Sequence, residues 1–506
     1  MKYLFLIIFI SISFQIAFLM LDKAPDTDEV WYMTIGENIL KTNFPSINGV
    51  DPYLIHPPLF THLIALFFKL FGKSFLIARL ISMISSLIVL IFTYFTVKEL
   101  KNKIANLSIF LLGINPFFLY FSSTVYIEMF LMALLSASIY YLFKGFKTNK
   151  SKYFLISGII VGLGTITKYN AFILVFAFII YNLIQFRWKI FFQKKIYIFL
   201  IPIIFIFSLW IIYGLMLDKK LFLDQQLFVL SYFNSKSWHL ATWRVVSNFT
   251  LLKQLVAVIT PVISIFFIIS LILTIFEIVR KKLKTTHSIF FLFIFLCLFI
   301  IGVLKTQFKD IHYPLPILGF IIVFSCYYLN DYFSFFLKKK TISFVGSIFF
   351  LWLSSPFSIF YNPLDNKFYD NIYIWGIKRD INYRIYQEIG KYLNDITSDN
   401  QIIVVETKST ITKWYINKKV IVSDMYFFDF ENKKEFVLKA DIVVLEEGIS
   451  AFLNDSEEEN FIKFIQEKFV LKKTFEFPFE KFSINTDQKI LKQGDKKKTV
   501  WVYVKK

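Results

Sequence analysis

Residues 75–97 read FLIARLISMISSLIVLIFTYFTV, a run in which Arg79 is the only charged side chain. An α-helix rises about 1.5 Å per residue, so a run of this length spans the hydrocarbon core of a bilayer, which is about 30 Å thick. Similar apolar segments recur along the chain between charged or turn-forming residues. We therefore predict a multi-pass α-helical membrane protein with about 11 spans. The predicted spans are residues 3–21, 75–97, 103–121, 124–143, 152–167, 169–186, 196–216, 254–279, 287–304, 312–333 and 341–360.

The composition of the chain supports the same class. Of its 506 residues, 56% are hydrophobic, 20% are aromatic and 18% are charged. Soluble domains have about 45–50% apolar and about 25% charged residues, so disorder, a fibrous repeat and a simple soluble enzyme are excluded. The net charge of +20 would indicate a nucleic-acid partner in a soluble protein. In a membrane protein the position of the charge matters more than its sum, and we expect no nucleic acid.

The basic residues indicate how the chain is oriented in the membrane. Lysine and arginine are enriched in short loops on the cytoplasmic side. In the arrangement of about 11 spans, the basic short loops all fall on the same side as Lys2. We therefore expect a cell-membrane protein with a cytoplasmic N-terminus and an extracytoplasmic C-terminus. The predicted cytoplasmic loops lie at residues 98–103, 144–152, 187–195, 280–284 and 338–340.

The chain changes character near residue 361, where charged residues of both signs return in nearly equal numbers. We divide it into a membrane domain, residues 1–361, and a soluble α/β domain, residues 362–506, on the outer face. The predicted strands of the second domain are residues 401–406, 419–423, 441–445 and 499–504, and its predicted helices are residues 385–396 and 459–469.

The first outer loop, residues 22–74, contains the most informative polar residues. Two short helices, at residues 33–40 and 59–71, suit a position at the membrane interface. Asp28 and Glu29 precede the first of them. Asp28 could cap that helix at its N-terminus, or the acidic pair could supply a general base or a metal ligand at the bilayer surface.

Several motifs occur along the chain in a recognisable order. Together they resemble the polyprenyl-phosphate-sugar-dependent glycosyltransferases of the GT-C fold, which include the dolichyl-phosphate-mannose-protein mannosyltransferases and the aminoarabinose transferases that modify lipid A. The resemblance covers about residues 20–320 and is most specific in the first 170. The motifs are Asp28-Glu29-x-x-Tyr32, His56-Pro57-Pro58-Leu59, Leu70-Phe71-Gly72-Lys73-Ser74, Ala78-Arg79-Leu80-Ile81-Ser82, Asn115-Pro116, Ser122 to Glu128, Gly158-x-x-x-Gly162-Leu-Gly164-x-x-x-Lys168 and Phe308-Lys309-Asp310-Ile311-His312-Tyr313-Pro314.

The resemblance implies sugar transfer from a polyprenyl-phosphate donor to a protein, lipid or glycan acceptor. Transfer with inversion needs a base for the acceptor proton, and we assign that role to Asp28. Glu29 would orient Asp28 or contact the acceptor. Adjacent carboxylates raise each other's pKa, which suits a base. Glu128 begins a predicted span, where a carboxylate indicates function by default, although it could be a helix-end acid facing water.

The leaving phosphate needs positive or hydrogen-bonding groups to hold it. The candidates are His56, Arg79, Lys168, Lys309 and His312. Lys168 has a second interpretation as a lysine whose side chain snorkels to the interface. Arg79 could instead form a structural pair with Asp28 or Glu37.

A divalent metal ion is a possible cofactor, with Asp28, Glu128 and His56 as ligands. Two departures from the family pattern bear on this role. Many relatives carry an acidic or basic residue where this chain has His56, and some carry aspartate where it has Glu128. Two other features are predicted to serve packing: the glycines of the Gly158 motif and the Trp210-Ile-Ile-Tyr213-Gly214 segment.

Two other functions remain open at the level of sequence. A polytopic transporter or lipid flippase of cell-envelope glycan precursors would place ionisable residues in the middle of several spans and repeat one half of the chain in the other. The charges here gather at the outer ends of the spans instead. A non-catalytic assembly subunit would give the Asp28-Glu29 pair no role. The identities of the sugar and the acceptor also stay open.

Overall fold

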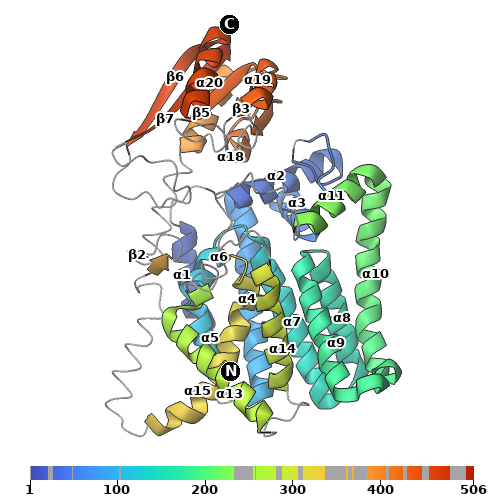
Figure 1. Ribbon diagram of the computed structural model, residues 1–506. Helices are drawn as coiled ribbons and strands as arrows, with labels where there is room; N and C mark the ends of the chain where they lie inside the picture. Colours follow the sequence, from blue (N-terminus) through green and yellow to red (C-terminus); the bar gives the residue numbers. More distant parts are fainter. Residues whose placement is uncertain are drawn as a thin grey trace. The chain divides into compact units, whose positions relative to one another are not determined.

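The structure is a computed structural model, and its described residues form two compact units (Figure 1). The membrane unit comprises Met1–Leu21, Pro52–Phe233 and Val246–Ile374, and the second unit comprises Asp22–Asp51, Asn234–Val245 and Trp375–Lys506. The predicted boundary between residues 361 and 362 stays a prediction. The described residues are 2–20, 25, 27–47, 49–101, 104–232, 255–256, 258–280, 288–305, 312–336, 360–362, 367–369, 385–405, 409–424, 430–446, 455–478 and 497–506.

Within its described residues, the membrane unit is helical apart from one short antiparallel pair, β1 (Phe360–Asn362) and β2 (Lys367–Tyr369). The 3₁₀ turns among these residues are η2 (Tyr169–Ala171), η3 (Arg187–Phe192) and η5 (Leu315–Ile317). The helices are α1 (Lys2–Met20), α3 (Leu59–Phe71), α4 (Phe75–Lys101), α5 (Ala105–Gly113), α6 (Pro116–Ser122), α7 (Ile127–Thr148), α8 (Ser151–Thr165), α9 (Phe172–Phe186), α10 (Lys194–Leu217), α11 (Lys219–Tyr232), α13 (Pro261–Val279), α14 (Ser288–Lys305) and α15 (Leu318–Phe336).

The helices support a multi-pass membrane protein. Within the described residues, five helices are long and apolar enough to cross a membrane, or six if the bent pair α5 and α6 is one span. Residues 341–359 of the last predicted span lie outside the described part of the chain. The other predicted spans each overlap a described helix. The count of about 11 spans therefore stays a prediction.

The predicted span 103–121 is wrong as a single straight helix, because α5 and α6 meet at an angle of 63°. The reason lies in the Asn115-Pro116 pair. Proline cannot continue the hydrogen-bond ladder of a helix, but it fits the first turn of a new one. The Asn115 side-chain oxygen accepts hydrogen bonds from the backbone N–H groups of Phe117 and Phe118, both at 3.0 Å, and so caps α6.

The glycines of the Gly158 motif allow α8 to pack closely against α10, as predicted. A β-carbon on Gly158 would lie 2.3 Å from the carbonyl oxygen of Phe199. A β-carbon on Gly162 would lie 2.8 Å from a methyl carbon of Ile206. Helix α8 also packs against α7, so these glycines help to fix the hairpin that carries Glu128 and Lys168.

The second unit contains a five-stranded sheet in the order β4-β3-β5-β7-β6. Strands β3 (Ile402–Val405), β4 (Ile421–Asp424) and β5 (Ile442–Glu446) run parallel to one another. Strand β7 (Lys497–Lys505) pairs antiparallel with β5 on one side and with β6 (Phe469–Pro478) on the other. The four predicted strands are present, as is the helix over residues 385–396. The helix predicted over residues 459–469 is present as part of α20 (Asp455–Lys468). Strand β6 was not predicted. The remaining helices are α18 (Ser409–Trp414) and α19 (Phe430–Leu438).

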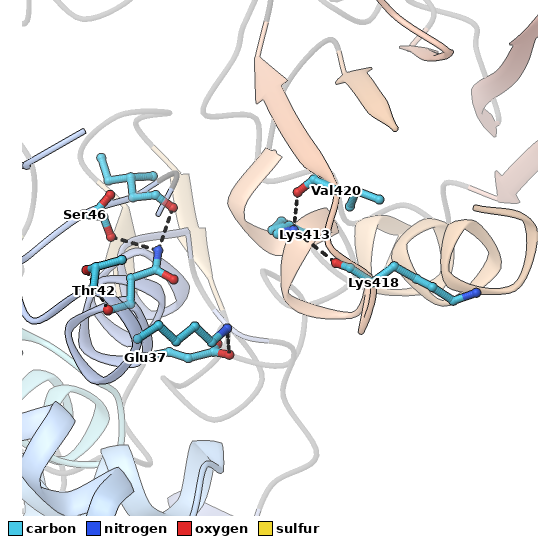
Figure 2. Close-up of polar contacts among 9 residues, drawn as sticks. Glu37, Thr42, Ser46, Lys413, Lys418 and Val420 are labelled. Carbon is cyan, nitrogen blue, oxygen red and sulfur yellow. Dashed lines mark hydrogen bonds and ion pairs between the residues drawn. The ribbon is translucent and has the colours of Figure 1, made fainter. Parts of the chain in front are cut away.

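Helix α2 (Thr27–Thr42) belongs to the second unit and packs against α18. Figure 2 shows the polar contacts near the end of α2, where Lys41 pairs with Glu37 at 2.7 Å and the Asn38 amide donates to the carbonyl of Ser46. The predicted capping role of Asp28 is wrong, because α2 begins at Thr27. Asp28 and Glu29 lie in the first turn, where the helix dipole favours negative charge.

Candidate active site

The candidate active site centres on Glu128, in the first turn of α7. Its carboxylate is almost fully buried, with 2% of the side chain exposed, and its Oε1 atom accepts a hydrogen bond from the Lys168 ammonium. His312 Nε2 lies 3.4 Å from the same oxygen. The chain enters α7 through Tyr126, whose extended backbone donates its N–H to the Ser82 hydroxyl at 3.4 Å. Glu128 is therefore not a helix-end acid facing water.

Lys168 reaches Glu128 from the turn between α8 and η2. Its backbone N–H donates to the carbonyl of Gly164 at 2.9 Å, so the turn is tied to the glycine-rich end of α8. Its ammonium lies 5.2 Å from the centre of the Tyr313 ring, an arrangement that favours a cation. With 16% of its side chain exposed, Lys168 is ion-paired inside the protein and does not snorkel into water.

His312 and Tyr313 enter the site from the turn that precedes η5, which packs on α7. The His312 ring is buried and lies 5.3 Å from the Tyr126 ring, centre to centre. It also contacts the Tyr313 ring edge-on at 4.7 Å. Two aromatic rings thus pack against the histidine that faces Glu128.

His56 lies in the segment that joins α2 to α3. The part of this segment from Pro52 onward belongs to the membrane unit, and it is this part that contains His56. Burial lowers the pKa of His56 from 6.5 to about 4; the positive charge of Lys168 adds to this effect, and the negative charge of Glu128 opposes it. At neutral pH the imidazole is therefore uncharged and offers one donor and one acceptor nitrogen. These couplings associate His56 with the Glu128–Lys168 pair.

The structure thus brings together four predicted residues, Glu128, Lys168, His312 and His56. Arg79 is buried on α4 with its guanidinium 5.5 Å from the centre of the Phe75 ring, and its phosphate role stays a prediction. Lys309 lies outside the described residues. Asp28 and Glu29 belong to the second unit, where Glu29 is fully buried and Asp28 is partly exposed. Their catalytic roles also stay predictions.

The described residues do not fit a metal centre. No group of three His, Cys, Asp or Glu side chains within the described ranges is arranged to hold an ion. The Glu128 Oε1 atom accepts from the Lys168 ammonium, and this neighbouring positive charge opposes the binding of a metal cation at the same carboxylate. A lysine in this position supplies the positive charge that a divalent ion would otherwise bring.

Sequence reasoning missed the aromatic and amide residues around the site. Tyr126 and Tyr313 lie inside quoted motifs, but no role was assigned to either, and that position was the only signal for them. Gln225 and Gln226 gave none. Trp210 packs with Leu54 and Phe222 in a buried cluster, so its predicted packing role is confirmed.

Two comparisons bear on the family of this chain. Residues 55–213 match the family of dolichyl-phosphate-mannose-protein mannosyltransferases, a segment that contains His56, Arg79, Glu128 and Lys168. No curated protein sequence matches the chain.

Solved structures match over most of the chain. The apo structure of ArnT from Cupriavidus metallidurans has a TM-score of 0.65 at 10% identity and covers 99% of this chain and 98% of its own. ArnT bound to undecaprenyl phosphate has a TM-score of 0.63 at 10% identity, with the same coverage. The oligosaccharyltransferase AglB from Archaeoglobus fulgidus, in complex with an inhibitory peptide and a dolichol-phosphate, has a TM-score of 0.56 at 12% identity and covers 87% of this chain and 69% of its own.

The likeness to ArnT and AglB establishes the fold, and the family match adds a sequence resemblance over the segment that holds most of the site. The chain is therefore a multi-pass membrane protein with the GT-C fold, and it resembles the polyprenyl-phosphate-sugar-dependent glycosyltransferases.

Proposed function

We propose that the chain is a membrane glycosyltransferase that moves a sugar from a polyprenyl-phosphate-linked donor to a hydroxyl or amine of a protein, lipid or glycan acceptor. The family match over residues 55–213 supports this proposal, as does the fold shared with proteins solved with undecaprenyl phosphate and dolichol-phosphate. The proposed partners are the lipid donor, the acceptor and the surrounding membrane lipids.

One observation carries the proposal: the second oxygen of the buried Glu128 carboxylate. Oε1 is held by Lys168 and His312, whereas Oε2 is buried without a hydrogen-bond partner among the described residues. Nearly all buried polar atoms in proteins have a partner. We assign this oxygen to a hydroxyl of the bound sugar or acceptor.

In the proposed reaction, the bond between the anomeric carbon and the phosphate oxygen breaks, and a bond from that carbon to the acceptor oxygen or nitrogen forms. The electron pair of the broken bond stays on the phosphate. The acceptor proton passes to a carboxylate, and we assign this base role to Asp28, the more exposed member of the acidic pair. Glu29, which is buried, would orient Asp28.

Lys168 and His312 are the best placed of the proposed phosphate ligands. An ammonium has three N–H donors, and Glu128 takes one from Lys168. The others remain for phosphate oxygens, where a charge-assisted bond is strong once water is excluded. We assign supporting contacts to His56, Arg79 and Lys309.

We propose that the reaction takes place on the outer face of the membrane. Glu128 lies in the first turn of α7, whereas Lys147 lies in the last turn, within the predicted cytoplasmic loop 144–152. The site and that basic loop are thus at opposite ends of one helix. Because basic loops are retained in the cytoplasm, this placement supports an extracytoplasmic site.

A transfer assay tests the proposal directly. Purified protein in nanodiscs is incubated with polyprenyl phosphates that carry different labelled sugars, together with peptide, lipid and glycan acceptors. The expected result is movement of one label to one acceptor class. Movement of labelled lipid across the bilayer without transfer of the sugar would instead support the flippase alternative.

Replacing Asp28 with asparagine is expected to reduce transfer by about 10²–10⁴-fold, because the acceptor proton then lacks its base. Expression and detergent stability should not change, since the side chain keeps its size. The matched control is Asp51→Asn, which changes an exposed acid of the same unit. Full activity of Asp28→Asn would remove Asp28 from the mechanism.

A further inference from the structure

Two adjacent glutamines on α11 hold the backbone just before His56. The Gln225 side chain accepts the N–H of Leu54 at 2.6 Å and donates to the carbonyl of Pro52 at 3.3 Å. The Gln226 side chain donates to the carbonyl of Leu54 at 2.6 Å. Together, the two side-chain amides pair with the 52–54 backbone much as a neighbouring strand would.

A second layer of hydrogen bonds fixes Gln226 itself. The Tyr169 hydroxyl donates to the Gln226 side-chain oxygen at 2.7 Å, and the Trp210 indole N–H donates to the Tyr169 hydroxyl at 3.2 Å. Tyr169 follows Lys168 directly in the chain. The turn that carries the site lysine is therefore linked through one side chain to the glutamine that holds the His56 segment.

The His56 segment is fixed at both ends. At one end, Leu54 is fully buried against Trp210 and Phe222. At the other, the N–H of Leu59 donates to the carbonyl of Ile166 at 3.1 Å, two residues before Lys168. Pro57 and Pro58 restrict the backbone between these anchors.

We propose that Gln225 and Gln226 are positioning residues that set the location and the partial burial of His56 by holding the 52–54 backbone. Tyr53 stands between Pro52 and Leu54, the two residues that the glutamines bind. Its ring contacts the His56 ring edge-on, with 6.0 Å between the ring centres. A shift of the held backbone therefore moves His56. The effect of the two glutamines on sugar transfer rests on the proposed function. Their effect on the position of His56 is independent of that function.

The positioning role has a consequence that a purely structural role lacks. While the segment is held, burial and the Lys168 charge keep the pKa of His56 near 4. Release of the segment admits water to the imidazole and moves its pKa toward 6.5, the ordinary value. The uncharged state of His56 at mildly acidic pH thus depends on two side chains of another helix.

The test measures the chemical reactivity of His56 and the transfer rate in the same full-length variants. Of the two protonation states of histidine, diethylpyrocarbonate modifies the neutral imidazole. Its rate of reaction at His56, followed by site-resolved mass spectrometry from pH 4 to pH 8, therefore reports both the pKa of the imidazole and its access to solvent. The variants are Gln225→Ala, Gln226→Ala and Tyr169→Phe, the last of which removes a single hydroxyl. The matched control is Asp224→Ala, which removes an exposed side chain from the same helix.

The wild type and Asp224→Ala are expected to show one slow rate of His56 modification, nearly constant above pH 5. Each glutamine variant should react several-fold faster, with a midpoint shifted upward by about one pH unit. Because each variant loses two side-chain hydrogen bonds, we also expect a loss of about 10-fold or more in transfer rate. Tyr169→Phe should show the same changes at smaller size.

Folded glutamine variants in which the midpoint and reactivity of His56 stay unchanged would overturn the inference, even if their transfer rate fell. A shifted midpoint in a protein whose wild type transfers no sugar would overturn the proposed function and leave the positioning role standing. Thermal unfolding in detergent identifies any variant that fails to fold, and Tyr169→Phe then decides the question.

Discussion

Helix α7 contributes one member of a glutamate–lysine ion pair at each of its ends. At its start, Glu128 pairs with Lys168, and the two side chains are 2% and 16% exposed. At its end, Lys147 pairs with Glu99 of α4 at 2.8 Å, and the exposed fractions are 65% and 24%. The same two residue types meet in both places, so the difference lies in their surroundings.

The physical value of the two pairs differs accordingly. An exposed pair contributes about 0–1 kcal/mol, because water and salt screen the charges. A buried pair costs several kcal/mol of desolvation to form, and breaking it leaves an uncompensated charge. Burial of a pair is therefore poorly explained by stability alone. The Glu128–Lys168 pair is better explained as part of a site, and the Glu99–Lys147 pair serves as its internal control.

The largest expected difference between the pairs is in activity. Glu128→Gln should reduce sugar transfer by about 100-fold or more, because the variant loses the charge that orients Lys168 and His312. Glu99→Gln should leave transfer within about twofold of wild type. The assay is transfer of labelled sugar by matched amounts of purified protein. Equal losses in both variants would show that the pairs do not differ in function.

The next largest difference is in stability. Lys168→Ala should lower the free energy of unfolding by about 3–5 kcal/mol, since it leaves a carboxylate buried and unpaired. Lys147→Ala should cost less than about 1 kcal/mol. Denaturant unfolding in detergent measures both changes.

The double variant Glu128→Gln, Lys168→Met sharpens this test, because it removes both charges at once. It should recover much of the lost stability but none of the transfer. A double variant as unstable as Lys168→Ala would mean that shape, and not charge, accounts for the loss.

The smallest expected effect is a pH dependence associated with the buried pair. The pKa of His56 lies at about 4 in the folded protein, below its ordinary value of 6.5. The unfolded chain therefore takes up a proton that the folded protein does not. The contribution of His56 to stability is complete above pH 6.5 and is lost as the pH falls toward 4, by about 1–3 kcal/mol.

The His56→Gln variant isolates this contribution, because glutamine does not titrate. The difference in unfolding midpoint between wild type and variant should change across this pH window and be constant above it. A constant difference from pH 4 to pH 8 would contradict the lowered pKa of His56.

Much of the membrane unit could be predicted from the sequence because its signals are local. Apolar runs between charges predict helices, and the overlap of the predicted spans with described helices reflects this. The break between α5 and α6 also has a local cause, the Asn115-Pro116 pair. It was not predicted, because the apolar residues on both sides form one continuous run. Strand β6 was missed because its lysines interrupt the alternation that marks a strand.

The residues of the candidate site could be predicted from the sequence, but the contacts between them could not. Glu128, Lys168, His312 and His56 were each selected by residue type and motif. Their contacts depend on how α7, α8 and the turn before η5 pack, and no periodicity carries that information. The same reason explains why the pairing of Lys168 with Glu128 was not predicted, although Lys168 was considered as a phosphate ligand and as a snorkelling lysine. It also explains why Gln225 and Gln226 were overlooked.

Glu128 and Lys168 are 40 residues apart, near the start of α7 and just beyond the end of α8, two helices that pack together. During synthesis the lysine therefore emerges shortly after the glutamate. A lone carboxylate at the edge of a bilayer is costly, so a helical hairpin that carries its own counter-ion inserts more readily than one that must wait for a later helix. His312 is made much later. The Glu128–Lys168 pair is thus synthesised before His312, which is the last of these residues to join the site.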